Sequence, residues 1–322
     1  MLDFGTYPTP VECLEQLSTP STALWVKRDD LTNSQYGGSK VRKLGPLLED
    51  AKRRGATRLA TLGAIGSHHV LATGVFGKRA GFSVEAVVMP QPQSRHVLQT
   101  ARASIGQGVR MIPATSYREA TRQLAICVEQ GAYAIPTGGS NALGTLGLLT
   151  AATELEVQIH AGLLPEPNLI VVALGSGGTA AGLCAGLVRT RLRTRVLAIA
   201  VAEPVKVFSE RAHALAYELL DPSLRGHFDA RLEVDRSYLG EGYGLPTPKS
   251  VRAAHEAARV GLALDDTYTA KAFAAALDRV ALGQEQTVLF WNTLSSASLE
   301  PLLADAPKEH DLAPEIRQLA RA

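Results

Sequence analysis

The chain has 322 residues, of which 46% are hydrophobic and 20% are charged, and its formal net charge at pH 7 is +2. These values are typical of a globular protein with room for two domains of ordinary size, or for one large domain with an insertion. The near-neutral charge argues against nucleic acid or a membrane surface as a partner, and no stretch reaches the roughly 20 apolar residues of a membrane span.

The cysteine content and the N-terminus indicate the compartment. The three cysteines, Cys13, Cys127 and Cys184, are an odd number without metal-ligand spacing, which argues against a disulfide framework and for a reducing environment. Residues 1–5 lack the basic and apolar regions of a signal peptide. We therefore expect a cytoplasmic enzyme or binding protein.

Short apolar or β-branched runs alternate with longer segments of helical period. In chain order the sequence predicts strand 24–26, helix 47–54, strand 58–62, helix 69–80, strand 84–89, helix 94–105, strand 109–112, helix 117–130, helix 145–156, strand 169–174, helix 179–188, strand 196–202, helix 249–260 and strand 287–291. This alternation is typical of βαβ units and parallel sheets.

The predicted fold class is α/β, with two open, twisted, mainly parallel sheets flanked by helices. No long linker separates two halves, so we expect one domain inserted within another. The expected boundaries give a large cofactor-binding domain of residues 1–44 and 153–322 and a small domain of residues 45–152. The charged segment from Ala304 is expected to be a solvated helix or tail.

A lysine follows a tight glycine turn early in the chain, in the segment Gly37-Gly38-Ser39-Lys40-Val41-Arg42-Lys43-Leu44. The glycines permit close backbone approach and positive φ, and a helix start lowers the pKa of a nearby amine. Lys40 is therefore a candidate for a Schiff base with an aldehyde cofactor. By itself such a string also fits a loop that carries a solvated lysine.

A second glycine turn follows the apolar strand 169–174, in the segment Gly175-Ser176-Gly177-Gly178-Thr179. A strand, a glycine turn and a helix start together make an anion site, because backbone amides and the helix dipole converge there. The segment lacks the Lys-Ser/Thr of a P-loop and the third glycine of a dinucleotide fingerprint. A compact phosphate such as that of pyridoxal phosphate fits better, and a plain strand-to-helix turn is the structural alternative.

These motifs belong to an ordered series that covers nearly the whole chain and resembles the fold-type-II pyridoxal-phosphate enzymes, in particular the D-cysteine desulfhydrase and 1-aminocyclopropane-1-carboxylate deaminase family. The series comprises Thr9-Pro10, Lys27-Arg28-Asp29-Asp30-Leu31-Thr32, the Lys40 segment, Gly63-Ala64-Ile65-Gly66-Ser67-His68-His69, Gly138-Gly139-Ser140-Asn141, the Gly175 turn, Gly242-Tyr243-Gly244-Leu245-Pro246 and Asp265-Asp266-Thr267-Tyr268-Thr269. The resemblance implies a tryptophan synthase β-like fold, pyridoxal 5'-phosphate as cofactor, a small amino acid as substrate and a homodimer.

The resemblance also implies roles for individual residues. Lys40 would hold the cofactor and shuttle the Cα proton, and residues 175–179 would cradle the phosphate. Ser67 would bind the substrate carboxylate or assist proton transfer, a role compatible with capping the following helix. Tyr243 and Tyr268 would face the substrate, with buried packing as the alternative. The implied reaction is β-elimination to a 2-oxo acid and ammonia, with sulfide as the leaving group.

Thr269 bears on the choice of reaction. The cyclopropane deaminases carry a glutamate at this place, which keeps the pyridine nitrogen of the cofactor protonated. A neutral hydroxyl would instead hydrogen-bond an unprotonated nitrogen, and the weaker electron sink still suits elimination of a good leaving group. Thr269 therefore favours the desulfhydrase reaction over ring opening.

Several positions depart from the family pattern. His68 replaces the asparagine that contacts the 3'-oxygen of the cofactor, and an imidazole can donate the same hydrogen bond. Gly66 replaces a glutamine and Ser39 an asparagine. Asn292-Thr293-Leu294-Ser295 replaces a His/Thr-Gly-Gly turn. Together these changes predict an altered pocket, with a shifted substrate or reduced activity.

Other functions stay open at this point. Within the same fold, ring-opening deamination and β-replacement are alternatives. A degenerate family member that only binds the cofactor or an amino acid is another, and so is a nucleotide-phosphate protein that uses only the Gly175 turn. We expect no metal site, because the adjacent His68 and His69 would point about 100° apart on a helix and no carboxylate has a chelating spacing.

Overall fold

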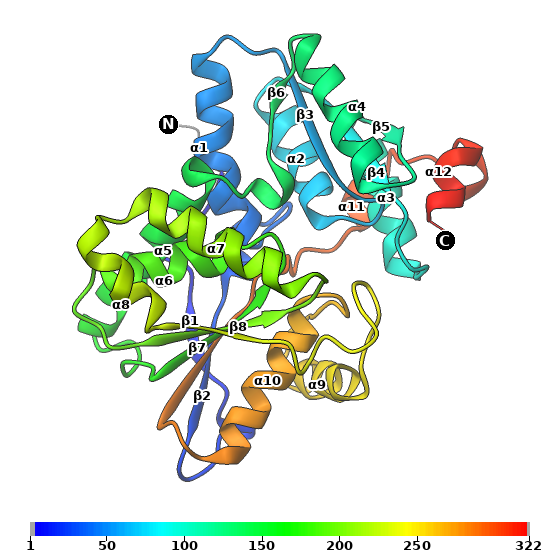
Figure 1. The fold of residues 1–322 in the computed structure, drawn as a ribbon. Coiled ribbons are helices and arrows are strands. Elements are labelled where there is room, and N and C mark those ends of the chain that lie inside the picture. The colour runs from blue at the N-terminus through cyan, green and yellow to red at the C-terminus, as the bar shows by residue number, and fades with distance from the viewer. Residues whose placement is uncertain (1–3, 321–322) are drawn as a thin grey trace. The chain divides into compact units, whose positions relative to one another are not determined.

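The computed structural model describes residues 4–320 and divides the chain into two compact units. The first unit contains Phe4, residues 44–139 and residues 297–320, and the second contains residues 5–43 and 140–296. Each unit is built on its own sheet with helices around it, which confirms the predicted α/β class with two mainly parallel sheets (Figure 1). Among residues 4–320 there is no helix with the length and apolar character that crossing a membrane requires.

The first unit contains a four-stranded parallel sheet in the order β5-β4-β3-β6. Its strands are β3 (Arg58–Ala64), β4 (Ser83–Met89), β5 (Val109–Pro113) and β6 (Tyr133–Ala134). Its helices are most of α1 (Ser39–Arg53), α2 (His68–Arg79), α3 (Arg95–Gly106), α4 (Tyr117–Glu129), α11 (Glu300–Leu303) and α12 (Pro314–Leu319).

Helices cover both faces of this sheet, as expected for a parallel arrangement. On one face α2 packs so closely that a Cβ at Gly77 would come within 2.6 Å of Val84. On the other face Ala60 of β3 packs with Cys127 of α4. Because side chains alternate along a strand, both sets of apolar residues in β3 and β4 are buried.

The C-terminal segment packs within the first unit. Arg102 of α3 donates to the carbonyl of Pro307 at 2.7 Å, and the amide of Gln91 donates to the carbonyl of Leu319. Helix α12 is present where a solvated helix or tail was expected, but Ile316 and Leu319 on it are buried. The division into compact units thus differs from the predicted domains at Phe4, Leu44, residues 140–152 and residues 297–320, and the contacts of the C-terminal segment explain the last of these.

The second unit contains a six-stranded sheet in the order β1-β2-β10-β7-β8-β9, in which only β1 is antiparallel to its neighbour. Its strands are β1 (Val11–Cys13), β2 (Ala23–Lys27), β7 (Leu169–Leu174), β8 (Arg195–Ala200), β9 (Leu232–Asp235) and β10 (Thr287–Trp291). Its helices are the first turn of α1, α5 (Ala142–His160), α6 (Gly178–Val188), α7 (Val205–Leu219), α8 (Arg225–Asp229), α9 (Pro248–Arg259) and α10 (Thr269–Leu282).

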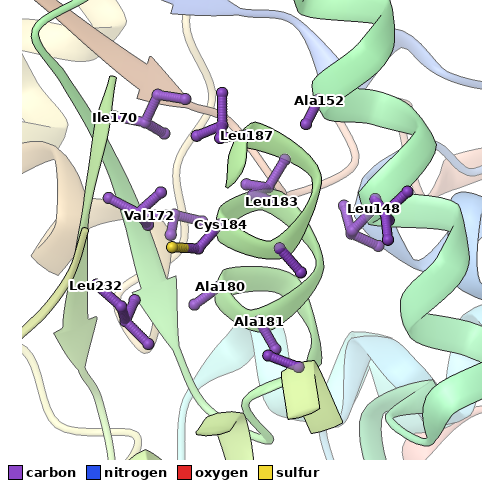
Figure 2. Close-up of a cluster of buried hydrophobic side chains, with 14 of the residues drawn as sticks. Leu148, Ala152, Ile170, Val172, Ala180, Ala181, Leu183, Cys184, Leu187 and Leu232 are labelled. Carbon is purple, nitrogen blue, oxygen red and sulfur yellow. The ribbon is translucent and has the colours of Figure 1, made fainter. Parts of the chain in front are cut away.

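Helix α6 lies between β7 and α5 in the core of this unit. Figure 2 shows Ile170 and Val172 of β7 pointing towards α6, with Leu148 of α5 on its far side. The approach of α5 is close, since a Cβ at Gly182 would lie 2.6 Å from Leu148. Val171 faces the opposite way, into the core formed with α10. Burial of both faces of β7 fixes its carboxyl end, where the Gly175 turn begins.

Candidate active site

The turn that precedes Lys40 is held by the loop after β10. Gly38 has a φ of +92°, and a Cβ there would lie 2.6 Å from the carbonyl oxygen of Thr293. The amide of Ser39 donates to this same oxygen at 3.1 Å, and the amide of Gly37 donates to Oγ of Ser295 at 2.8 Å. Ser295, which belongs to a segment that departs from the family pattern, therefore stabilises the glycine turn before Lys40.

Lys40 lies in the first turn of α1, and its amine donates no hydrogen bond within residues 4–320. Burial lowers the pKa of this amine from its ordinary value of 10.5, and the carboxylate of Asp265 partly opposes that effect. The unprotonated fraction at neutral pH is therefore larger than for a solvated lysine. An unprotonated amine is the form that attacks an aldehyde and accepts a proton.

Lys43 follows one helical turn later and contacts the second glycine segment. Its side chain is 1% exposed, and Nζ donates to Oγ of Ser140 at 3.1 Å. The Ser140 hydroxyl in turn lies 2.7 Å from Oγ of Ser176. Burial and the positive charges of Lys40 and Arg211 hold the pKa of Lys43 well below its ordinary value of 10.5. An anion bound beside these groups would offset the cost of the buried cation.

The segment 175–179 has the geometry of an anion-binding turn. Gly177 adopts a φ of +90° and precedes α6, which begins at Gly178. None of the backbone amides from Ser176 to Thr179 donates a hydrogen bond within the described part of the chain. A Cβ at Gly178 would lie 2.5 Å from Oγ of Ser140 and 3.1 Å from Nζ of Lys43. The unpaired amides, the helix dipole and the lysine thus converge on one small volume.

Tyr243 and Tyr268 form a pair next to this turn. Their hydroxyl oxygens are 2.8 Å apart and their rings meet edge to face, with centroids 5.7 Å apart. The ring of Tyr268 would lie 3.0 Å from a Cβ at Gly175. Burial raises the pKa of Tyr243 to about 12 and raises that of Tyr268 well above its ordinary value of 10. Both hydroxyls therefore keep their protons at neutral pH.

Thr269 begins α10, and its hydroxyl is engaged by Asp265. It donates to Oδ1 of Asp265 at 2.6 Å and accepts from the backbone amide of Asp265 at 2.8 Å. Thr269 is 1% exposed. The sequence predicted that this hydroxyl would donate its proton to the ring nitrogen of the cofactor. In this geometry it donates the proton to Asp265 instead.

Ser67 and His68 lie in the first unit, at the start of α2. Oγ of Ser67 accepts from the amides of His69 and Val70, at 3.2 and 3.4 Å, so Ser67 caps the helix as expected. Nε2 of His68 lies 3.1 Å from Nε2 of His96 on α3. The departure at Gly66 also has a structural cause, since a Cβ there would come within 2.9 Å of Cα of Val97.

A buried ion cluster anchors the first turn of α1. The guanidinium of Arg42, between the two lysines, donates to Oδ1 of Asp29 at 2.7 Å and to Oε2 of Glu154 at 2.9 Å. Nε1 of Trp291 donates to Oδ2 of Asp29 at 2.8 Å. The cluster therefore ties the lysine turn to β10 and α5.

Comparison with known proteins assigns the chain to a family. The model of the family described as "Pyridoxal-phosphate dependent enzyme" matches residues 2–293. The chain belongs to this family. It is 32% identical over 312 residues to the D-cysteine desulfhydrase of Klebsiella pneumoniae, an alignment that covers 91% of this chain and 93% of the relative.

Two further relatives are similar over most of their length. A Thermotoga maritima protein with the provisional name 1-aminocyclopropane-1-carboxylate deaminase is 31% identical over 301 residues, which is 91% of this chain and 95% of the relative. A crystal structure titled as an ACC deaminase homologue aligns with a TM-score of 0.77 and 27% identity, and it covers 94% of this chain and 96% of that one. The fold type II class that the sequence predicted is thereby confirmed.

The residues present fit the cofactor of the pyridoxal-phosphate dependent enzymes. A phosphate requires a compact cationic and amide-lined cradle, which Lys43 and the turn at residues 175–179 provide. An aldehyde requires an unprotonated amine, which burial favours at Lys40. The sequence predicted Lys40 and the glycine turn as site residues, but it assigned no role to Lys43, Ser140 or Arg211. Lys43 had a signal in its spacing, because residues three apart share one face of a helix, and Ser140 lies in one of the quoted motifs, whereas no pattern pointed to Arg211.

Proposed function

We propose that this pyridoxal-phosphate-dependent enzyme catalyses β-elimination from a small amino acid, with cysteine as the model substrate. Cysteine and water would give a 2-oxo acid (pyruvate), ammonia and sulfide, so that the Cα proton and the β-substituent both leave. The observation that carries the proposal is the cradle in which Lys43, Ser140 and Ser176 adjoin the start of α6, with Lys40 one turn earlier on α1.

We assign separate roles in the reaction to Lys40, to the two tyrosines and to the phosphate cradle. The bound cofactor withdraws electrons from Cα of the substrate. Nζ of Lys40 takes the Cα proton, because its lowered pKa leaves the amine partly unprotonated. The hydroxyls of Tyr243 and Tyr268 stay protonated and are suited to donate a proton to the leaving group. Lys43 and the amides of residues 176–179 hold the phosphate.

For Ser67 and His68, at the start of α2 in the first unit, we propose the roles that the family resemblance implies. The Ser67 hydroxyl accepts from two amides of α2, and its own proton is not used in those bonds, so it suits a substrate carboxylate. His68 is proposed to donate to the 3'-oxygen of the cofactor. Thr269 is proposed to lie next to the pyridine ring of the cofactor, with its hydroxyl donating to Asp265.

Ring opening of 1-aminocyclopropane-1-carboxylate is the second candidate reaction. Its support is the similarity to the Thermotoga maritima protein and to the ACC deaminase homologue, which is as extensive as the similarity to the desulfhydrase. Its product would be 2-oxobutanoate and ammonia. The neutral residue at Thr269 makes elimination our first choice.

Two measurements test the proposed function. Borohydride reduction of the loaded enzyme, followed by peptide mapping, is expected to find the cofactor on Lys40; finding it on Lys27, Lys43 or Lys78 refutes the assignment. Release of 2-oxo acid from a panel of D- and L-amino acids and 1-aminocyclopropane-1-carboxylate identifies the reaction. A protein that holds the cofactor but leaves the whole panel unchanged would be a binding protein instead.

We further propose that the enzyme is a cytoplasmic homodimer. The three cysteines are free thiols, which suits a reducing compartment. Leu146 and Val157 on α5, with Leu163 just beyond it, are exposed apolar side chains of the kind that a subunit interface covers. Light scattering coupled to gel filtration distinguishes a dimer near twice 34.2 kDa from a monomer.

A further inference from the structure

Asp265 precedes α10 and has no role in the function proposed so far, yet its carboxylate accepts four hydrogen bonds. Oδ2 accepts from the amides of Thr267 and Tyr268, at 3.1 and 2.9 Å. Oδ1 accepts from the amide of Thr269 at 2.9 Å and from its hydroxyl at 2.6 Å. With four donors and 8% exposure, the carboxylate is held in one orientation.

The carboxylate also acts on the groups that the proposed reaction uses. Its negative charge raises the pKa of the Lys40 amine and of the Tyr243 and Tyr268 hydroxyls. The same charge also acts to raise the pKa of Tyr36 and of Lys271. The positive charges of Lys43 and Lys40 act on each other. The charge of Asp265 thus favours the protonated form of both the proposed base, Lys40, and the proposed acids, Tyr243 and Tyr268.

Backbone geometry connects Asp265 to the glycine turn. The amide of Tyr268 is fixed by Oδ2, and the ring of the same residue lies against Gly175 while its hydroxyl meets Tyr243. Movement of the Tyr268 backbone would move the ring over the turn that begins at the end of β7. A single carboxylate therefore sets both the position of one reacting side chain and the charge near another.

We propose that Asp265 is a positioning residue for the reaction, which fixes the first turn of α10 with Tyr268 and Thr269 and supplies the negative charge that acts on Lys40. The inference rests on the proposed function, because it takes Lys40 as the reacting amine. It assigns Asp265 no contact with substrate or cofactor.

The variants separate the charge from the hydrogen bonds. Asp265→Asn removes the charge and keeps the shape, and Asp265→Ser removes the charge but leaves a good helix-capping hydroxyl should the asparagine variant fail to fold. Thr269→Val removes one donor to the carboxylate and the acceptor of the Asp265 amide, but no charge. The neighbouring Asp266, which is exposed, provides Asp266→Asn as the matched control for loss of one acidic group.

The readout is trace acetylation of the full-length chain freed of cofactor, measured on the Lys40 peptide across pH. Loss of the Asp265 charge is expected to shift the midpoint of labelling to lower pH in Asp265→Asn and Asp265→Ser, because that charge favours the protonated amine. Thr269→Val and Asp266→Asn are expected to leave the midpoint where it is in the unmodified chain. A merely structural role for Asp265 would not produce this pattern.

One result overturns the inference: both Asp265 variants fold and label Lys40 with the unmodified chain's midpoint. Failure of the proposed function appears elsewhere, as borohydride fixation of the cofactor on a lysine other than Lys40 in the unmodified enzyme. The midpoint measurement needs no cofactor, so the two failures are distinguishable. As a second readout, the acid limb of the pH profile for 2-oxo acid release is expected to move to lower pH in the Asp265 variants alone.

Discussion

The hydroxyl of Thr269 and the backbone and side chain of Asp265 form a closed pair: the hydroxyl donates to Oδ1 at 2.6 Å and accepts from the Asp265 amide at 2.8 Å. Both residues are buried. The first turn of α10 is therefore organised by bonds within the protein, whatever else the site binds.

Replacement of Thr269 by glutamate is expected to destabilise the protein. The new carboxylate would lie beside that of Asp265, and the Asp265 amide would lose its acceptor. We expect the free energy of unfolding in urea to fall by about 1–3 kcal/mol, the cost of a buried group left unpaired. Thr269→Ser keeps the hydroxyl and serves as the control. Equal stability of Thr269→Glu and the unmodified chain would contradict the described pairing.

Lys43→Met tests the phosphate cradle. The affinity for pyridoxal 5'-phosphate is expected to fall by about 10- to 100-fold, which is about 1.4–2.7 kcal/mol, through loss of a charge-assisted bond. The affinity for pyridoxal, which has no phosphate, is expected to stay the same. Equilibrium binding monitored by absorbance gives both values, with Lys52→Met on the exposed side of α1 as control. An equal loss for both ligands would argue against a phosphate contact.

The stability of the cofactor-free protein is expected to depend on pH through Lys43. Burial and the neighbouring cations lower the pKa of Lys43 in the folded state below the 10.5 of the unfolded chain. Between these two values the unfolded chain binds a proton that the folded chain lacks, so the free energy of unfolding rises with pH. Urea unfolding from neutral pH to about 10 should show this rise. Lys43→Met should reduce the slope without abolishing it, because the pKa of Lys40 is also lowered in the folded state, and an unchanged slope would contradict the assignment.

Tyr243→Phe is expected to impair catalysis with little effect on the cofactor. The lost hydroxyl is bonded to that of Tyr268, and its pKa of about 12 keeps it protonated at working pH. We expect kcat for 2-oxo acid release to fall by at least about 100-fold, as for loss of a general acid. Tyr217→Phe removes a hydroxyl that is bonded to Asp229 on the surface and is the matched control. Similar rates in the two variants would exclude an acid role.

Gly178→Ala is expected to obstruct the start of α6. The new Cβ would come within 2.5 Å of Oγ of Ser140, a contact that the backbone does not allow without a shift. We expect the cofactor affinity to fall by about tenfold or more, measured by reconstitution of the cofactor-free chain. Gly226→Ala on α8 meets nothing within 4 Å and should leave that affinity unchanged. A Gly178→Ala protein with full affinity would refute the close packing.

The sequence predicted the longer strands of both sheets better than the helices that border the site, and it missed the short strands β1, β6 and β9. Strands at residues 169–174 and 287–291 were placed at their observed bounds, because continuous apolar runs mark strands buried on both faces. Helix α7, which contains Arg211, and helix α10, which begins at Thr269, were missed. Alanine-rich or mixed segments without a sharp polar face give little periodic signal.

Helix α1 shows why local rules failed at the lysine turn. The sequence predicted a helix only from residue 47, but the observed helix starts at Ser39 and contains Pro46, a residue that a helix interior disfavours. The carbonyl of Arg42, which loses its helical donor to Pro46, is met by α5, where a Cβ at Gly147 would lie 1.9 Å away. The tertiary contact that permits this arrangement comes from a residue more than 100 positions later, which no local pattern reveals.

The placement of residues 297–320 in the first unit has a consequence for synthesis of the chain. The strands of that unit's sheet end at Ala134, but its buried Ile316 and Leu319 are translated only after residue 296. All of residues 140–296, which belong to the second unit, leave the ribosome in between. The first unit therefore cannot acquire α11 and α12 until all of residues 140–296 have been synthesised.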